Sequence, residues 1–257
     1  YSRNCWCNSF IFCDIKLIIP HPCHSNKGQT FVIIQSMNRK IEFAPESYFH
    51  IYNRGVEKRK IFLNHKDYQR FLALLYLCNN TAPVDIRSIF NKGLTFADIF
   101  NIERKNILVD IGAYCLMPNH IHLLVKPKSE NGVALFMQKL FTGYTMYFNK
   151  KNERTGRLFE SAFKANLADT DEYLKYLFAY IHLNPIKLIE PEWKDKGIKN
   201  LGEAKKFLNG FQWSSYGYYL GQIGKEPIVN NKEFPEYFEN NKEFKDFIND
   251  WMSFTKV

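Results

Sequence analysis

The chain has 257 residues, of which 46% are hydrophobic and 24% charged, and this is the composition of an ordinary globular protein. No apolar run is long enough to cross a membrane, so the sequence argues against a membrane-spanning protein. The formal net charge is +9 at pH 7, and aromatic residues make up 16% of the chain. Positive charge favours a polyanionic partner. Basic and aromatic side chains together suit single-stranded nucleic acid, although we expect most of the rings to fill the core.

The first 36 residues differ from the rest of the chain. They show no hydrophobic periodicity and no secretory signal, and Met37 looks like a natural start. We therefore interpret residues 1–36 as upstream sequence read through in frame, or as a disordered extension. Four cysteines in this segment, together with His24, could be drawn as a zinc site, but the spacing matches no common zinc pattern; they are Cys5, Cys7, Cys13 and Cys23. The two scattered cysteines of the body, Cys78 and Cys115, fit a reducing cytoplasm.

The body of the chain alternates between strand-like and helix-like segments. The aromatic and β-branched run 48–53 predicts a strand that ends in a turn at Arg54-Gly55. The predicted elements that follow are a helix over 65–78, a hairpin of strands over 107–115 and 120–125, a helix over 132–149, a strand over 163–167 and a helix over 172–184. This order predicts an α+β fold with antiparallel strand pairs. We place the main domain at 37–190, with a variable insertion at 79–105 and a helical extension at 191–257.

Two histidines on one predicted strand form the first candidate site. In His120-Ile121-His122 the side chains alternate between the faces of the strand, so both imidazoles point to the same side. Two imidazoles one strand repeat apart can chelate a divalent ion. Taken alone the pattern is weak, because it often arises by chance.

A tyrosine and an asparagine on the predicted helix 172–184 form the second candidate site. The apolar stripe of this helix should face the sheet; it consists of Leu174, Leu177, Phe178 and Ile181. Tyr180 and Asn184 are four residues apart and therefore stack on one face beside this stripe, whereas His182 lies far round the helix. The phenol of Tyr180 and the amide carbonyl of Asn184 can thus both contact a group at the edge of the apolar stripe. Without the histidines, the pair is better explained as a half-buried tyrosine and a C-terminal cap before Pro185.

Six sequence blocks follow one another in a distinctive order. The central block is Tyr-Cys-Leu-Met-Pro-Asn-His-Ile-His-Leu-Leu-Val at 114–125. The other five lie at 48–55, 143–149, 156–160, 180–185 and 213–216. Together they resemble the motifs of the REP-associated tyrosine transposases, relatives of the small single-tyrosine HUH insertion-sequence transposases. The resemblance runs over about 45–220, and several ordered blocks are far more specific than any single one.

The resemblance implies an HUH endonuclease fold, in which helices pack on a ferredoxin-like central antiparallel sheet. It also implies that His120 and His122 bind Mg²⁺ or Mn²⁺ with Asn184 as a third ligand, and that Tyr180 is the nucleophile. The implied activity is DNA transposition, in which single-stranded DNA with hairpin or palindromic ends is cleaved and rejoined through a 5′-phosphotyrosine intermediate. These assignments coincide with the two candidate sites predicted from strand and helix geometry.

Three basic residues close in sequence to these sites are the best candidates for DNA contacts, namely Arg54, Arg157 and Lys164. Contacts of this kind would be salt-dependent and largely blind to sequence, and the alternative for each residue is a solvated basic surface. One tyrosine holds one DNA end at a time, so a homodimer is one way to pair two ends. We expect such a protein in the bacterial cytoplasm, associated with the nucleoid.

Two other functions are compatible with the same residues. One is a catalytically silent protein that binds hairpin nucleic acid, because intact ligands do not prove that activity persists. The other is a metal-dependent phosphodiesterase that uses water, with Tyr180 as a bystander. Cleavage with and without the tyrosine hydroxyl separates the three functions.

Overall fold

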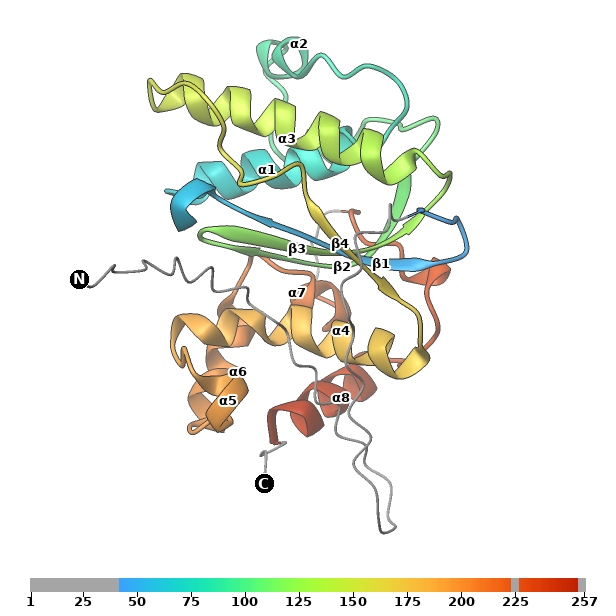
Figure 1. Cartoon of the computed structure of the whole chain (residues 1–257), viewed down its shortest axis with the longest axis vertical. Helices are drawn as coiled ribbons and strands as arrows, with labels where there is room; N and C mark the ends of the chain where they lie inside the picture. The colour runs from blue at the N-terminus through green and yellow to red at the C-terminus, as the bar shows by residue number, and fades with distance from the viewer. Residues whose placement is uncertain (1–41, 223–226, 254–257) are drawn as a thin grey trace, which may run out of the picture. The chain divides into compact units, whose positions relative to one another are not determined.

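A four-stranded antiparallel sheet lies at the centre of the fold (Figure 1). The computed structural model describes residues 42–222 and 227–253, so the expectations for residues 1–36, including the zinc pattern, lie outside the described residues. The strands are β1 (Tyr48–Arg54), β2 (Val109–Met117), β3 (His120–Pro127) and β4 (Lys164–Ala168), in the order β2-β3-β1-β4. Helix α1 (His65–Leu77) joins β1 to β2, and α3 (Gly132–Lys151) joins β3 to β4. This is the ferredoxin-like arrangement, and the predicted α+β class is confirmed.

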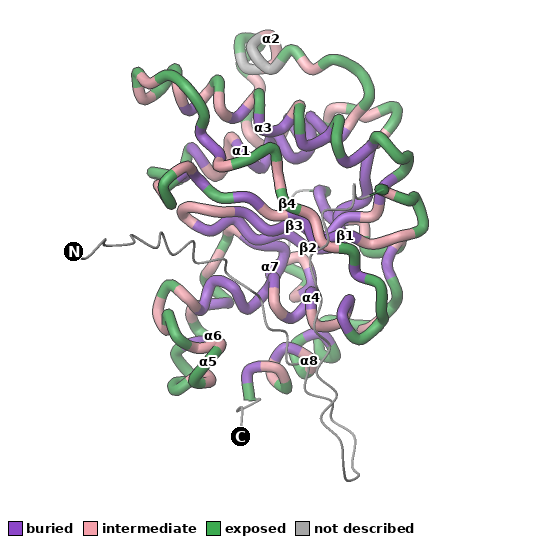
Figure 2. The backbone as a smooth tube through the Cα atoms, in the orientation of Figure 1, coloured by how far each residue is buried: buried purple, intermediate pink, exposed green. Residues whose placement is uncertain are grey.

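Helices cover both faces of the sheet (Figure 1). Helices α1 and α3 contact each other on one face, and α4 (Asp171–Leu183) contacts β2 and β3 on the other. Strands β1, β2 and β3 are therefore mostly buried, whereas the edge strand β4 is largely half-buried or exposed (Figure 2). Every residue of β2 is buried, which explains why this strand is apolar on both faces except at Asp110 and does not alternate.

The predicted elements exist, but three of them differ in detail. Strand β2 extends to Met117, so the hairpin turn consists of only Pro118 and Asn119. The insertion 79–105 contains an unpredicted helix, α2 (Ile86–Asn91), and the weak helical stretch near its end is a single 3-10 turn, Asp98–Asn101. A further 3-10 helix, Asn184–Leu188, follows α4 directly.

Helix α4 ends as predicted, with Asn184 as its C-cap, but the backbone conformation of Asn184 differs from the expectation. Pro185 was expected to end the helical path at Asn184, because proline disfavours helical geometry in the residue before it. Asn184 nevertheless has φ −53° and ψ −37°, and the chain continues into the 3-10 helix. Proline is tolerated there because the first turn of a helix needs no N–H donor from it. At the other end, Thr170 caps α4 by accepting a hydrogen bond from the backbone N–H of Tyr173.

The segment after residue 190 covers the face of the sheet that carries α4 (Figure 1). Its helices are α5 (Trp193–Lys196), α6 (Leu201–Gly210), α7 (Tyr216–Tyr219), a 3-10 turn at Asn231–Glu233 and α8 (Asn241–Ser253). Within the described ranges, no helix combines the length and apolar character needed to cross a membrane.

The sequence block 213–216 has a structural explanation. Its backbone pairs with the edge strand β2, because Trp213 O accepts from Leu116 N–H and Ser215 N–H donates to Tyr114 O. The Trp213 ring also stacks on Tyr68 of α1, with ring centroids 4.4 Å apart. The block thus covers an otherwise open sheet edge and ties it to the helix layer on the opposite face.

A buried polar chain connects this block to α4. The N–H of Tyr114 donates to Ser215 Oγ at 2.9 Å, and Ser215 Oγ lies 2.7 Å from Nε2 of His182. On its other nitrogen, His182 Nδ1–H donates to the carbonyl of Phe178 at 2.8 Å. Both ring nitrogens of His182 and the hydroxyl of Ser215 are thus paired, and this buried network fixes how α4 sits on the sheet.

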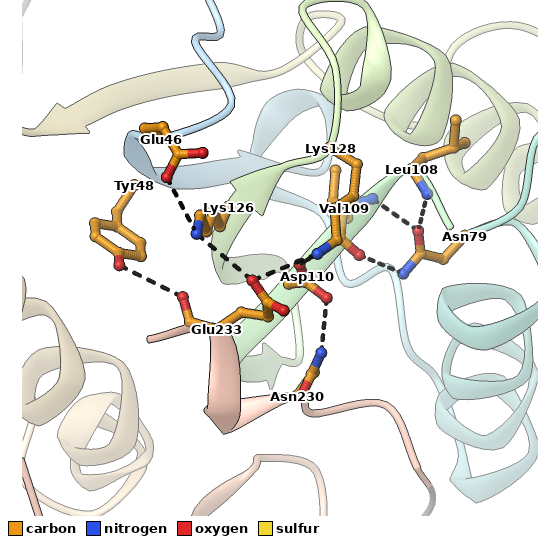
Figure 3. Close-up of polar contacts among 10 residues, drawn as sticks. All are labelled: Glu46, Tyr48, Asn79, Leu108, Val109, Asp110, Lys126, Lys128, Asn230 and Glu233. Carbon is orange, nitrogen blue, oxygen red and sulfur yellow. Dashed lines mark hydrogen bonds and ion pairs between the residues drawn. The ribbon is translucent and has the colours of Figure 1, made fainter. Parts of the chain in front are cut away.

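The other end of β2 is held by a second polar cluster (Figure 3). The buried carboxylate of Asp110 pairs with Lys128 at 2.5 Å and accepts from the side chain of Asn230 at 2.9 Å. Glu233 lies 3.5 Å from both Lys126 and Lys128. The cluster therefore fastens the C-terminal segment to the sheet. Close packing reinforces it, since a Cβ at Gly112 would lie 2.7 Å from the ring of Phe234.

Candidate active site

The two histidines of β3 lie on the face of the sheet that α4 covers. His120 pairs across the sheet with Arg54, and His122 with Tyr52. The two imidazole rings have centroids 5.1 Å apart and are nearly perpendicular. His122 is buried and His120 half-buried, so the pair sits at the margin of the core.

Helix α4 brings a tyrosine and an asparagine to these histidines. The centroid of the Tyr180 ring lies 5.3 Å from that of His122, and Asn184 Oδ1 lies 3.4 Å from His120 Nε2. The four residues singled out in the sequence therefore meet in one place. The cause is the apolar stripe of α4, which is buried against the sheet and leaves the neighbouring helical face at its edge; it consists of Leu174, Leu177, Phe178 and Ile181.

A third histidine belongs to the same cluster and was not predicted. His50 of β1 is buried, and its Nε2 lies 2.9 Å from Nδ1 of His122. Its ring stacks on those of His122 and Tyr52, and meets Tyr180 edge-on at 5.9 Å. Strand alternation on β1 would have placed His50 and Tyr52 on one face, but only the pairing register brings that face to His122.

A lysine from beyond α4 also reaches the cluster. The Nζ of Lys194 on α5 lies 3.8 Å from the centre of the Tyr180 ring, a cation–π geometry. Nine residues lie between Asn184 and Lys194, and no local pattern in the sequence indicated the contact. Tyr176, one turn before Tyr180, stacks on it with ring centroids 5.7 Å apart. The Tyr180 ring is thus held between a cation, a second phenol and the histidines.

The three histidines are held in their neutral form. Burial lowers the pKa of His50 to about 3, with a further decrease from the charge of Lys194. Burial lowers the pKa of His120 to about 4, and it lowers the pKa of His122 well below its ordinary value, with help from His50. Neutral imidazoles keep a lone pair at neutral pH, which metal binding requires.

The donor set is suited to a hard or borderline divalent cation. His120 Nδ1 lies 2.7 Å from Asn119 Oδ1, and since an amide oxygen only accepts, Nδ1 carries the proton. His120 Nε2 therefore presents a lone pair toward Asn184 Oδ1. The Asn184 side chain is fully buried, and its Nδ2 has no hydrogen-bond partner. Two acceptors that face each other inside the protein suit an intervening cation.

In the described part of the chain, no group of three or more His, Cys, Asp or Glu side chains is arranged to hold a metal ion. At the histidine pair, the amide oxygen of Asn184 is placed where it could act as a third protein donor. Three protein donors leave coordination positions for water or substrate, as catalytic metal sites require.

The predicted DNA-contacting residues lie at different distances from this cluster. Arg54 pairs across the sheet with His120, and its side chain forms a 2.5 Å ion pair with Glu160. Lys164 is exposed on β4 opposite Tyr52, which places it on the same face as the histidines. Arg157 is exposed in the loop after α3, next to Leu158, whose carbonyl accepts from Val56 N–H. Arg54 and Lys164 therefore border the cluster, and Arg157 lies in the adjoining loop.

Comparison with known proteins identifies the class of the chain. Residues 46–184, more than half of the sequence, match the family described as "Transposase IS200 like", and the chain belongs to this family. The match includes all four residues of the predicted site, and it agrees with the resemblance to single-tyrosine transposases. No curated protein is similar enough to match the chain.

Among the solved structures that match the chain is one that is similar to it in part. It is described as "Structure of the REP associates tyrosine transposase bound to a REP hairpin", and it shares 12% sequence identity with this chain. The similarity covers 76% of this chain and 91% of the other, with a TM-score of 0.44. The family assignment rests on the sequence match, and this chain is an IS200-like transposase by family.

Proposed function

We propose that this transposase cleaves and rejoins single-stranded DNA at hairpin ends, with Tyr180 as the nucleophile and a 5′-phosphotyrosine as the intermediate. The observation that supports this best is the meeting of a phenol and an imidazole pair from separate elements. Tyr180 comes from α4 and its ring lies 5.3 Å from that of His122 on the sheet. A nucleophile beside a candidate metal site is the arrangement that metal-assisted phosphoryl transfer requires.

The residues that would hold a divalent ion, Mg²⁺ or Mn²⁺, are His120, His122 and Asn184. Such an ion would polarise a non-bridging oxygen of the scissile phosphate and stabilise negative charge in the transition state. The rest of the chemistry belongs to the chain. Lys194 adds positive charge next to the Tyr180 ring, and such a charge would stabilise negative charge that develops on a phosphate bound there.

The reaction conserves the energy of the phosphodiester bond. The Tyr180 hydroxyl loses its proton and its oxygen attacks phosphorus, the bond from phosphorus to the 3′ oxygen breaks, and that oxygen takes up a proton and leaves as a free 3′-hydroxyl. In the reverse direction a 3′-hydroxyl attacks the phosphotyrosine, the new diester forms, and the tyrosine recovers its proton. Cleavage and rejoining therefore need no nucleotide cofactor.

The proposed partner is a DNA strand whose backbone passes the cluster at Arg54 and Lys164. Both are exposed and border the histidines, and Arg157 would extend the contact along the loop after α3. A folded hairpin next to a cleavable single strand would present both a duplex backbone and a flexible target to this surface.

Covalent capture of DNA tests the proposal. The full chain is incubated with end-labelled single-stranded hairpin DNA and Mn²⁺, and protein–DNA adducts are separated under denaturing conditions. We expect an adduct that is absent in Tyr180→Phe and absent in the presence of a chelator. The matched control is Tyr176→Phe, which removes a hydroxyl from the neighbouring ring of the same helix and should leave adduct formation intact.

The same assay separates the alternative functions. Cleavage that persists in Tyr180→Phe would contradict the proposal and favour a phosphodiesterase that uses water. Tight hairpin binding without cleavage under any metal condition would favour a silent binding protein.

A further inference from the structure

The hydrogen bond between two buried histidines carries an inference beyond the proposed site residues. His50 Nε2 and His122 Nδ1 are 2.9 Å apart, and the two residues are 72 positions apart in the chain. A hydrogen bond between two ring nitrogens needs one proton between them, so one ring must donate and the other must accept. Which ring donates decides what the far nitrogen of His122 can do.

Only one of the two arrangements leaves His122 able to bind a cation. If His122 Nδ1–H donates to His50, then His122 Nε2 carries a lone pair. If His50 Nε2–H donates instead, a neutral His122 carries its proton on Nε2, and that nitrogen cannot bind a metal. The ring of His122 is also restrained from turning over, because it is buried and stacks on those of His50 and Tyr52.

His120, the other candidate ligand, also carries its proton on Nδ1, but the neighbour that accepts this proton is a different residue. His120 Nδ1–H donates to Asn119 Oδ1 at 2.7 Å, which leaves Nε2 of His120 unprotonated. Each candidate ligand is therefore contacted at Nδ1 by a neighbour that can accept a proton. Such partners orient ligand rings and raise their basicity, and their loss typically weakens metal binding by about 10–100-fold.

We infer that His50 is a positioning residue that accepts the Nδ1 proton of His122 and thereby keeps Nε2 of His122 free to bind a divalent cation. The inference rests on the proposed function, because it assumes that His122 is a ligand. His50 itself contacts no substrate in this scheme and acts only through His122.

Two variants separate this role from a purely structural one. His50→Gln places a side-chain amide oxygen near the position of the imidazole Nε2, so it can still accept from His122. His50→Leu has a similar volume and cannot accept. We expect Mn²⁺ affinity, measured by titration calorimetry on the full chain, to fall about 10–100-fold in His50→Leu and to stay within a few-fold of the unaltered protein in His50→Gln.

Nitrogen-15 NMR of the metal-free full chain gives a readout that does not depend on metal. Chemical shifts of the ring nitrogens identify which one is protonated, and we expect the Nδ1–H form for His122 in the unaltered protein and in His50→Gln. The Nε2–H form in the unaltered protein would overturn the inference, as would His50→Leu binding Mn²⁺ as tightly as the unaltered chain.

The two readouts also distinguish the inference from the proposed function. If the unaltered chain shows the Nδ1–H form but binds no Mn²⁺, the metal site is contradicted while the assigned hydrogen bond stands. If it binds Mn²⁺ with His122 in the Nε2–H form, the metal site stands and the role of His50 is contradicted.

Discussion

The amide oxygen of Asn184 lies 3.4 Å from Nε2 of His120, although the residues are 64 positions apart and belong to different layers of the fold. His120 is on β3, and Asn184 directly follows α4, where it keeps helical backbone angles. The side chain of Asn184 is fully buried and its amide nitrogen has no partner. An asparagine that only capped its helix would not need this orientation, and the geometry favours a role as a donor to a cation.

Replacement of Asn184 tests this role. We expect Asn184→Ala to weaken Mn²⁺ binding by about 10-fold or more, because the third protein donor is lost. Asn184→Asp keeps an oxygen donor and adds negative charge, so it should bind Mn²⁺ at least as tightly as the unaltered chain. Titration calorimetry gives the affinities, and thermal unfolding shows whether the variants fold. Equal affinities in Asn184→Ala and the unaltered protein would rule out the amide as a ligand.

The polar chain through His182 and Ser215 should contribute to stability. Ser215→Ala leaves Nε2 of His182 and the N–H of Tyr114 buried without partners, so we expect the free energy of unfolding to fall by about 1–3 kcal/mol. Urea unfolding measures the change. Ser161→Ala is the control, since that side chain is exposed and its loss should have little effect. Equal free energies of unfolding for Ser215→Ala and Ser161→Ala would show that the hydrogen bonds through His182 and Ser215 do not hold α4 on the sheet.

Asp67 should make stability depend on acid pH. Burial raises the pKa of Asp67, but hydrogen bonds from Lys151, Leu63 N–H and Tyr147 outweigh it, and the pKa lies below its ordinary value of 3.8. Because the folded pKa is lowered, the stabilisation is complete above about pH 4 and is lost as the pH falls through the folded value.

Denaturant unfolding at several pH values checks this sign. We expect Asp67→Asn to be less stable than the unaltered chain at pH 7, with a difference that narrows below about pH 4. Asp246→Asn, at an exposed position on α8, serves as the control. A difference that stays constant down to pH 2.5 would mean that the charge of Asp67 does not contribute.

Lys164 should contribute to DNA binding through a phosphate. Lys164→Ala is expected to weaken hairpin binding and to lower the slope of log affinity against log salt by about 0.7, the value for one phosphate contact on single-stranded DNA. Fluorescence anisotropy over a range of salt concentrations measures the slope. Lys92→Ala removes an equal charge next to α2, away from the α4 face, and should leave the slope unchanged. Equal slopes for Lys164→Ala and the unaltered chain would exclude this contact.

The sequence predicted those parts of the site that follow from local periodicity. Alternation along a strand puts His120 and His122 on one face, and helical spacing puts Tyr180 and Asn184 together beside a buried stripe. The order of strands and helices predicted an α+β fold with antiparallel strand pairs, whereas the ferredoxin-like sheet was implied by the resemblance to the transposase family. These predictions needed no knowledge of contacts between distant segments.

The missed residues depend on contacts between distant segments. His50 meets His122 only through the register of β1 against β3, and that register is not encoded in either strand alone. Lys194 reaches Tyr180 from a short helix beyond the 3-10 turn, and Ser215 meets His182 only when the C-terminal segment folds over β2. Helix α2 was missed because its six residues are too few for a clear periodic pattern.

In the proposed reaction one phenol, that of Tyr180, becomes bonded to the phosphorus of DNA. The most direct test is to digest the covalent complex with protease and nuclease and to locate the attached nucleotide by tandem mass spectrometry. We expect a phosphodiester remnant on Tyr180 and on no other tyrosine, including Tyr176 one helical turn away. A remnant on a different residue, or cleaved DNA with unmodified Tyr180, would contradict it.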